Sequence, residues 1–84
     1  MNIIMYCTPY CPYCVRAKQL LNTKAVPYEV IDVDMDFNKR QEMEQKSGRT
    51  SVPQIFINEL HVGGFDDLSA LNIEGKLDQL LQDN

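Results

Sequence analysis

A strand, a helix and a second strand follow one another within residues 2–33, and this succession restricts the fold more than any other feature. Asn2–Cys7 is rich in β-branched and aromatic side chains, which is typical of a strand. From Pro12 to about Lys24, apolar residues recur at helical spacing. Tyr28–Val33 is a second predicted strand. A helical crossover makes the two strands parallel neighbours with a right-handed connection.

The rest of the chain predicts a helix, a hairpin and a final helical segment. Asp36 is a candidate N-cap for a helix to Ser47, and Gly48 is its stop signal. The elements expected after it are a strand at Val52–Asn58 with a tight turn at Asn58-Glu59, a strand at Leu60–Gly63, a helix opening at Asp66 or Asp67 and interrupted at Gly75, and a last amphipathic turn or two with Leu77, Leu80 and Leu81.

The order βαβ-α-ββα fits an α/β class fold with one four-stranded mixed sheet and helices on both faces. This is the minimal thioredoxin-like arrangement. With 84 residues, the chain is expected to be a single domain over 1–84, because two domains would leave neither half enough buried surface. Tyr6, Phe56 and Leu68 are expected in the core. His61, in the last strand, is expected at the surface or edge.

Composition excludes several classes of function. The net charge is −4 without a basic stripe, which argues against nucleic acid as a partner. The apolar run Ile3–Cys7 is far shorter than a membrane-spanning helix, so no membrane role is expected. Apolar residues at 44% and charged residues at 24% are typical of a folded globular chain.

The chain has three cysteines, and all of them fall between Cys7 and Cys14. Disulfide scaffolds of secreted proteins spread an even number of cysteines along the chain as staples. Disulfides among cysteines this close together cannot join distant parts of the chain. It indicates chemistry in a reducing compartment, which we expect to be the cytoplasm.

The segment Cys11-Pro12-Tyr13-Cys14 has the spacing of a redox dithiol. Cysteines at i and i+3 on a first helical turn lie on one face, with Cα atoms roughly 5–6 Å apart, within disulfide range. Cys11 stands at the helix N-terminus, where free N–H groups stabilise a thiolate, so it is expected to attack the substrate. Cys14 lies one turn further in and is expected to resolve the mixed disulfide. Tyr13 offers an apolar wall with a hydroxyl group.

Two metal-binding alternatives use the same cysteines. A structural zinc needs four ligands, and beyond the pair the candidates are Cys7 and His61. Cys7-x-x-x-Cys11-x-x-Cys14 also matches the spacing with which radical-SAM enzymes hold an iron–sulfur cluster. Those enzymes need a barrel-like domain of several βα units, and this chain has room for one such unit. We expect no metal site. Cys7 is expected to be a small apolar residue ending the first strand, and a redox role for it stays open as the alternative.

Three motifs in sequence resemble the glutaredoxins, specifically the small bacterial dithiol type. They are Cys11-Pro12-Tyr13-Cys14, Ser47-Gly48-Arg49-Thr50-Ser51-Val52-Pro53-Gln54-Ile55-Phe56-Ile57 and Gly63-Gly64-Phe65-Asp66-Asp67-Leu68. The resemblance covers almost the whole chain. It implies a glutathione-dependent thiol–disulfide oxidoreductase that reduces protein disulfides and protein–glutathione mixed disulfides through Cys11 and Cys14.

The resemblance also implies where glutathione binds. Val52-Pro53 resembles the family's cis-proline turn, which presents the Val52 backbone to the cysteinyl part of glutathione. The N–H groups after Gly64 suit the γ-glutamyl carboxylate, and Arg40 is placed like the side chain that reaches the glycine carboxylate. The implied glutathione-binding residues are Tyr13, Arg40, Ser51, Val52, Pro53, Gly64, Phe65, Asp66 and Asp67.

Two positions depart from the family pattern. Thr8 stands where a lysine is usual, which should weaken glutathione docking, and Ser51 replaces the usual threonine but keeps the hydroxyl group. We expect a monomer that uses glutathione as reductant and binds no cofactor tightly. Two alternatives stay open: a carrier bridging a [2Fe–2S] cluster with glutathione, and a thioredoxin-like electron carrier reduced by a flavoenzyme. The sequence selects no particular protein substrate.

Overall fold

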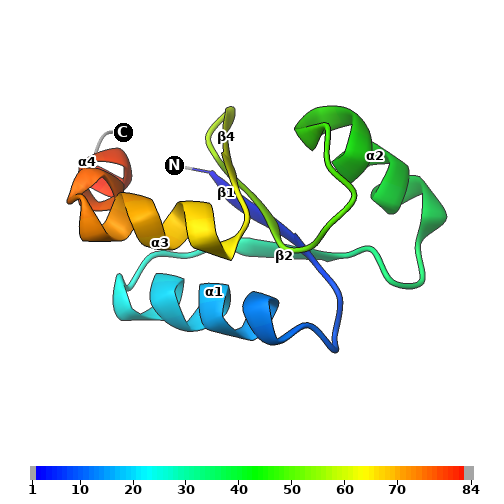
Figure 1. Cartoon of the computed structure of the whole chain (residues 1–84), viewed down its shortest axis with the longest axis horizontal. Helices are drawn as coiled ribbons and strands as arrows, with labels where there is room; N and C mark the ends of the chain where they lie inside the picture. The colour runs from blue at the N-terminus through cyan, green and yellow to red at the C-terminus, as the bar shows by residue number, and fades with distance from the viewer. Residues whose placement is uncertain (1, 83–84) are drawn as a thin grey trace.

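The computed structural model describes residues 2–82, in which four strands form one sheet with helices on both faces (Figure 1). In chain order the elements are β1 (Ile3–Cys7), α1 (Pro12–Thr23), β2 (Glu29–Asp32), α2 (Phe37–Ser47), β3 (Gln54–Ile57), β4 (Leu60–Gly63), α3 (Phe65–Ile73) and α4 (Lys76–Gln82). The strand order is β2-β1-β3-β4. β1 runs parallel to β2 and antiparallel to β3, which pairs antiparallel with β4. The expected mixed sheet is therefore confirmed.

The side chains of β1 alternate between two cores because successive residues of a strand point to opposite faces. Ile3, Met5 and Cys7 pack with residues of α1, α3 and α4 on one face. Tyr6 packs on the other face with Phe56 and with Met43 of α2, which is fully buried. Figure 1 shows α2 apart from α1 and α3, in agreement with the two cores.

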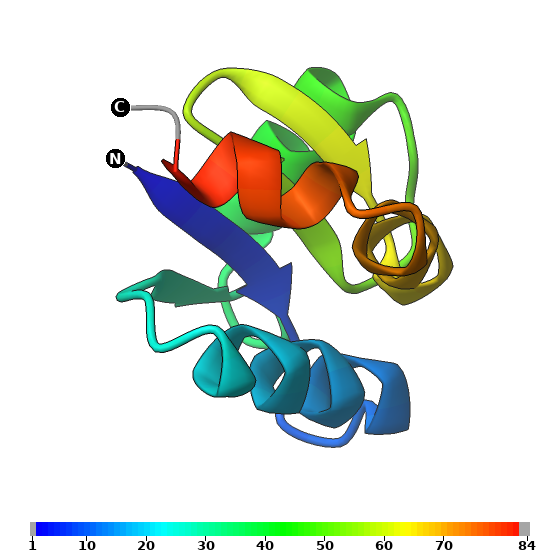
Figure 2. The same ribbon diagram turned by 90° about the vertical axis from the view of Figure 1, so that its left-hand side faces the viewer.

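Local signals place the ends of the helices. Cys11 is the N-cap of α1, and Pro12 takes the first helical position. Asp36 caps α2 by accepting a hydrogen bond from the Lys39 N–H at 3.1 Å. Gly48 ends that helix with a φ of 70°. The α3–α4 corner bends sharply (Figure 2) at Gly75, whose φ of 77° likewise favours glycine.

Several predicted boundaries were wrong by one or two residues, including the start of β1 at Ile3 rather than Asn2 and the end of β3 at Ile57 rather than Asn58. β2 is one residue shorter at each end than the predicted strand. Tyr28, whose hydroxyl donates a hydrogen bond to the Asn22 side chain, lies before the strand, and Val33 lies after it. β3 begins at Gln54 rather than Val52, because Pro53 has no N–H with which to pair. α3 begins at Phe65 rather than at Asp66 or Asp67, because Asp67 caps the helix from inside its first turn.

Met1, Asp83 and Asn84 lie outside the described residues. Tyr6, Phe56 and Leu68 are buried, as expected. Among the helices between residues 2 and 82, none has the length and apolar character that crossing a membrane requires.

Candidate active site

Cys11 lies where the loop after β1 enters α1. Its sulfur accepts a hydrogen bond from the Cys14 N–H at 3.3 Å, so the side chain caps the first turn of the helix. N–H groups at a helix N-terminus have no partner within the helix and carry partial positive charge. A thiolate is stabilised at such a position. Cys11 is also partly exposed, so this sulfur combines anion stabilisation with access from solvent.

Cys14 has the opposite environment. Its side chain is 1% exposed and packs in the core between the sheet and α1. Burial raises the pKa of the Cys14 thiol, and the neighbouring Cys11 and Cys7 thiols raise it further. The two cysteines are therefore an asymmetric pair, with one exposed sulfur at the helix end and one protonated sulfur beneath it.

The loop before β3 lies against the exposed sulfur. The Val52–Pro53 peptide bond is cis, as the family resemblance implied. The Cys11 thiol donates a long hydrogen bond to the Val52 carbonyl oxygen, with 3.7 Å between the sulfur and the oxygen. The fold thus brings together two motifs that are 41 residues apart in the sequence.

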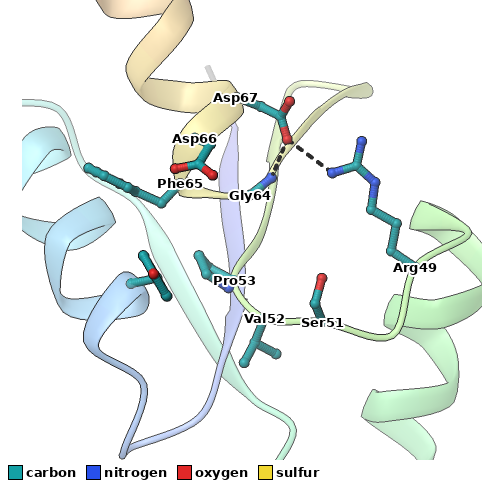
Figure 3. A pocket seen from close by; sticks show the side chains of 9 residues that line it. Arg49, Ser51, Val52, Pro53, Gly64, Phe65, Asp66 and Asp67 are labelled. Atoms are coloured by element: carbon teal, nitrogen blue, oxygen red, sulfur yellow. Dashed lines mark hydrogen bonds and ion pairs between the residues drawn. The ribbon is translucent and has the colours of Figure 1, made fainter.

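A pocket of about 210 Å³ adjoins this loop (Figure 3). Its lining comes from the start of α1, the loop before β3 and the start of α3. The lining residues are Tyr13, Arg49, Ser51, Val52, Pro53, Gly64, Phe65, Asp66 and Asp67. Every residue that the sequence predicted for glutathione binding is present here, except Arg40.

Asp67 is held in place by two partners at the pocket edge (Figure 3). One carboxylate oxygen accepts hydrogen bonds from the Gly64 N–H at 2.9 Å and from the Arg49 guanidinium at 3.0 Å. These two bonds hold the pKa of the Asp67 carboxyl below its ordinary value, with the Gly64 bond contributing most. Asp66 is exposed and, among residues 2–82, enters no ion pair. Asp66 is therefore the carboxylate that faces the pocket free to receive a cation.

Arg49 is the pocket residue that the sequence did not single out. It lies inside the Ser47–Ile57 motif, directly after the αL residue Gly48, and this position was the available signal. Arg40 does not line the pocket. Its guanidinium donates to the Thr50 carbonyl oxygen at 3.3 Å and lies 3.9 Å from the Glu44 carboxylate. Arg40 thus supports the chain immediately before Ser51.

A buried amide links β4 to the pocket loop. Gln54 is fully buried, and its side-chain nitrogen donates to the Ser51 carbonyl oxygen at 3.0 Å and to the Ser51 hydroxyl at 3.3 Å. Its oxygen is 2.8 Å from His61 Nε2. Because both amide protons are used on Ser51, the His61 Nε2 must carry a proton and donate it. His61 is on an edge strand as expected, but its ring is half-buried and faces inward.

The Asp67 bonds predict a dependence of stability on acid pH. The pKa of the Asp67 carboxyl is lower in the folded protein than its ordinary value of 3.8. The ionised carboxylate therefore contributes its full share to the free energy of unfolding above that ordinary value, and this share is lost as the pH falls through the lower folded pKa. We expect wild type to be more stable than Asp67→Asn, by an equal margin at about pH 7 and pH 5 and by a smaller margin at about pH 3. Urea denaturation of both proteins at each pH measures this margin. An unchanged margin at low pH would show that the Asp67 charge contributes nothing.

Within residues 2–82, no three His, Cys, Asp or Glu side chains gather in a way that could hold a metal ion. The three cysteines in this range are free thiols. What the site offers chemically is an accessible sulfur at a helix N-terminus with a second sulfur below it. On a thioredoxin-like sheet, this arrangement defines a thiol–disulfide oxidoreductase.

Comparisons with known proteins narrow that class. The glutaredoxin family profile matches residues 3–62. The glutaredoxin of Pseudomonas aeruginosa is 53% identical over 79 residues, covering 94% of each chain. The solution structure of glutaredoxin from Brucella melitensis has a TM-score of 0.85 at 52% identity, covering 96% of this chain and 88% of that one. The crystal structure of a buckwheat glutaredoxin–glutathione complex has a TM-score of 0.89 at 28% identity, covering 96% and 76%.

This chain belongs to the glutaredoxin family, the glutathione-dependent thiol–disulfide oxidoreductases.

Proposed function

We propose that Cys11 is the nucleophile and Cys14 the resolving thiol in the reduction of protein disulfides and protein–glutathione mixed disulfides. The Cys11 thiolate attacks one substrate sulfur, forms a mixed disulfide and releases the other sulfur as a thiolate. With a protein disulfide, Cys14 then attacks Cys11, frees the reduced protein and leaves a Cys11–Cys14 disulfide. Two glutathione molecules reduce that disulfide and leave as oxidised glutathione.

With a glutathionylated protein, Cys11 takes the glutathione and releases the protein thiol. A second glutathione then attacks the glutathionylated Cys11 and restores its thiolate. This branch needs no second cysteine. Because redox potentials of glutaredoxins lie near that of the glutathione pool, at about −200 to −230 mV, the reactions run in either direction.

One observation carries this proposal: the Cys11 sulfur is 3.7 Å from the carbonyl oxygen of Val52, which lines the pocket. A ligand whose backbone pairs with Val52 as an added strand places its own sulfur next to Cys11. Glutathione is a short peptide with a central cysteine and two charged ends, so it suits such an edge. The glutathione bound to the buckwheat relative supports the same ligand here.

The ends of glutathione are assigned by charge. The γ-glutamyl carboxylate meets the N–H groups of Phe65 and Asp66 at the start of α3, where the helix dipole favours an anion. Its ammonium group meets the exposed Asp66 carboxylate, since Asp67 is bonded to Gly64 and Arg49. Tyr13, Ser51 and Pro53 complete the walls.

The glycine carboxylate is assigned to Arg40, as the family resemblance implies. Its support in this fold is the bond from Arg40 to the Thr50 carbonyl oxygen, which keeps the guanidinium beside the loop that carries Ser51. Arg49 lines the pocket from the same loop and adds a second positive charge. Thr8 is uncharged and lines a different hollow, so it does not replace the positive charge of the usual lysine at this pocket.

We further propose that the protein works as a single-domain monomer in the cytoplasm, with glutathione as a transient reductant and no tightly bound cofactor. Free cysteines clustered at one site suit a reducing compartment.

The test uses Cys14→Ser, which removes the resolving thiol and traps the first intermediate. Treated with oxidised glutathione and analysed by intact-mass spectrometry, this variant is expected to gain one glutathione, which peptide mapping places on Cys11. Cys11→Ser/Cys14→Ser is the matched control and should gain none. An adduct on Cys7, or no adduct on Cys14→Ser, would overturn the assignment.

A further inference from the structure

Gln54 opens β3 and is, among residues 2–82, the only amide or charged side chain that is fully buried. Burying an amide costs free energy unless hydrogen bonds replace those to water. Here two bonds of the amide go to Ser51 and one joins it to His61. An apolar side chain could fill the same space, so the contribution of this amide lies in what its bonds hold in place.

The bond to Ser51 fixes the orientation of a peptide unit in the pocket loop. Ser51–Val52 is a trans peptide, since Val52–Pro53 is the only cis bond within the described part of the chain. A trans peptide is planar, and its C=O and N–H point in opposite directions. The Gln54 nitrogen lies 3.0 Å from the Ser51 carbonyl oxygen and holds it toward the interior. The Val52 N–H therefore points away from the interior and, within residues 2–82, donates to no protein acceptor.

This N–H is the donor that an added strand needs. In the proposed function a ligand pairs with the backbone of Val52, whose carbonyl oxygen lies 3.7 Å from the Cys11 sulfur. Rotation of the Ser51–Val52 peptide would turn the N–H away from such a ligand. The orientation of this one peptide therefore decides whether the loop offers a donor beside the acceptor.

His61 fixes which way round the Gln54 amide lies. A carbonyl oxygen only accepts hydrogen bonds, so the amide nitrogen faces Ser51 and the amide oxygen faces His61, 2.8 Å from Nε2. The imidazole packs on the Phe56 ring, with 4.9 Å between the ring centroids and 31° between the planes. Loss of the Nε2 donor would leave the buried amide oxygen without a partner and loosen the hold of the amide on Ser51.

We propose that Gln54 and His61 are positioning residues for glutathione, which hold the Ser51–Val52 peptide in the orientation that presents the Val52 N–H to the ligand. Neither side chain lines the pocket, so both act through Ser51. The inference rests on the proposed pairing of glutathione with Val52. It assigns to Gln54 and His61 an effect on the affinity for glutathione and none on the reactivity of Cys11.

The first test removes the amide donor and keeps the size of the side chain. Gln54→Met is expected to raise KM for a glutathionylated peptide by about five- to tenfold, the effect of one lost hydrogen bond. Its kcat should change by less than about twofold, because the lost contact binds substrate and transition state alike. Alkylation of Cys11 by iodoacetamide should keep its wild-type rate, since N–H groups of α1 stabilise the thiolate. An unchanged KM, or a fall in kcat alone, in folded Gln54→Met would overturn the inference.

A matched pair at His61 separates the donor from the ring. His61→Phe keeps a ring against Phe56 without a donor, and His61→Gln keeps a donor without a ring. We expect His61→Phe to raise KM by about two- to threefold and His61→Gln to restore the wild-type value. Gln54→Met/His61→Phe should have the KM of Gln54→Met alone, because His61 acts only through the amide. Additive effects, or a higher KM in His61→Gln than in His61→Phe, would contradict the inference, and this pair decides it if Gln54→Met does not fold.

The tautomer of His61 is a spectroscopic test of the same network. The chain has one histidine, so its ring signals need no assignment. Burial lowers the pKa of His61 below its ordinary value, so the ring is neutral at about pH 7.5. Long-range ¹H–¹⁵N correlation NMR is expected to place the proton on Nε2 in wild type, and a proton on Nδ1 would overturn the inference.

The activity of wild type separates the two proposals. If wild type does not reduce the glutathionylated peptide, the proposed function fails, and this inference fails with it. If wild type is active and the Gln54 and His61 variants match its KM, the inference alone fails.

Discussion

Cys11→Ser is expected to lose reduction of both protein disulfides and protein–glutathione mixed disulfides, by on the order of 10³-fold or more. The physical reason is that every branch of the reaction begins with the same sulfur. A serine hydroxyl at the N-cap keeps the helix capped, since serine is itself a preferred N-cap residue. The loss is therefore expected without a loss of stability. Turnover assays with each substrate class, together with thermal unfolding, measure the two effects separately.

Cys14→Ser is the matched comparison, because it removes only the resolving step. We expect it to lose reduction of protein disulfides while retaining reduction of glutathionylated protein, which requires Cys11 and glutathione alone. Equal loss of both activities in Cys14→Ser would contradict the division of roles. Retained activity in Cys11→Ser would contradict the identity of the nucleophile.

Gly63→Ala is expected to destabilise the protein more than the same substitution at any other glycine of the chain. Gly63 has a φ of +117°, which side chains rarely adopt, and an added Cβ would collide with the Asp67 carboxylate. Backbone strain and displacement of Asp67 together should lower the free energy of unfolding by about 2–4 kcal/mol. Displaced Asp67 also loses its bonds to Gly64 and Arg49, so glutathione affinity should fall as well.

Gly75→Ala provides the control for Gly63→Ala. Gly75 also has a positive φ, of 77°, but an added Cβ meets no atom within 4 Å. Gly75→Ala has the backbone strain without the collision. We therefore expect its free energy of unfolding to fall by about 1 kcal/mol and its glutathione binding to be unchanged. Urea denaturation and glutathione titration of both variants make the comparison. Equal losses of stability would show that the contact with Asp67 is unimportant.

Much of the fold was predictable because its signals are local. Pro12, the Asp36 cap and the αL Gly48 set helix ends through interactions within a few residues. The β-branched and aromatic side chains of Asn2–Cys7 likewise predicted a strand, and Tyr6 and Met5 occupy the cores on its opposite faces. The dithiol was equally predictable, since the spacing of Cys11 and Cys14 on one turn requires no distant partner.

The details that the sequence left open are those in which distant residues compete for the same group. Two arginines, Arg40 and Arg49, were possible neighbours of the pocket, and the choice depends on how the chain leaves α2. The αL turn at Gly48 carries Arg49 to Asp67, while Arg40 stays against Thr50. The Asp67 carboxylate accepts a hydrogen bond from the Gly64 N–H, so Asp66 is the pocket carboxylate that can receive a cation. The inward turn of His61 similarly depends on the buried amide of Gln54.

By itself, the sequence determined the order of helices and strands, the dithiol and its placement at a helix N-terminus, because each follows from residues close together in the chain. The tertiary structure decided which carboxylate and which arginine face the pocket, and that Val52 lies against the Cys11 sulfur. These placements depend on contacts between segments that are distant in the sequence and are brought together when the strands pair. At such contacts several side chains compete for the same hydrogen-bonding group or charge, and a local sequence pattern does not show which of them binds it.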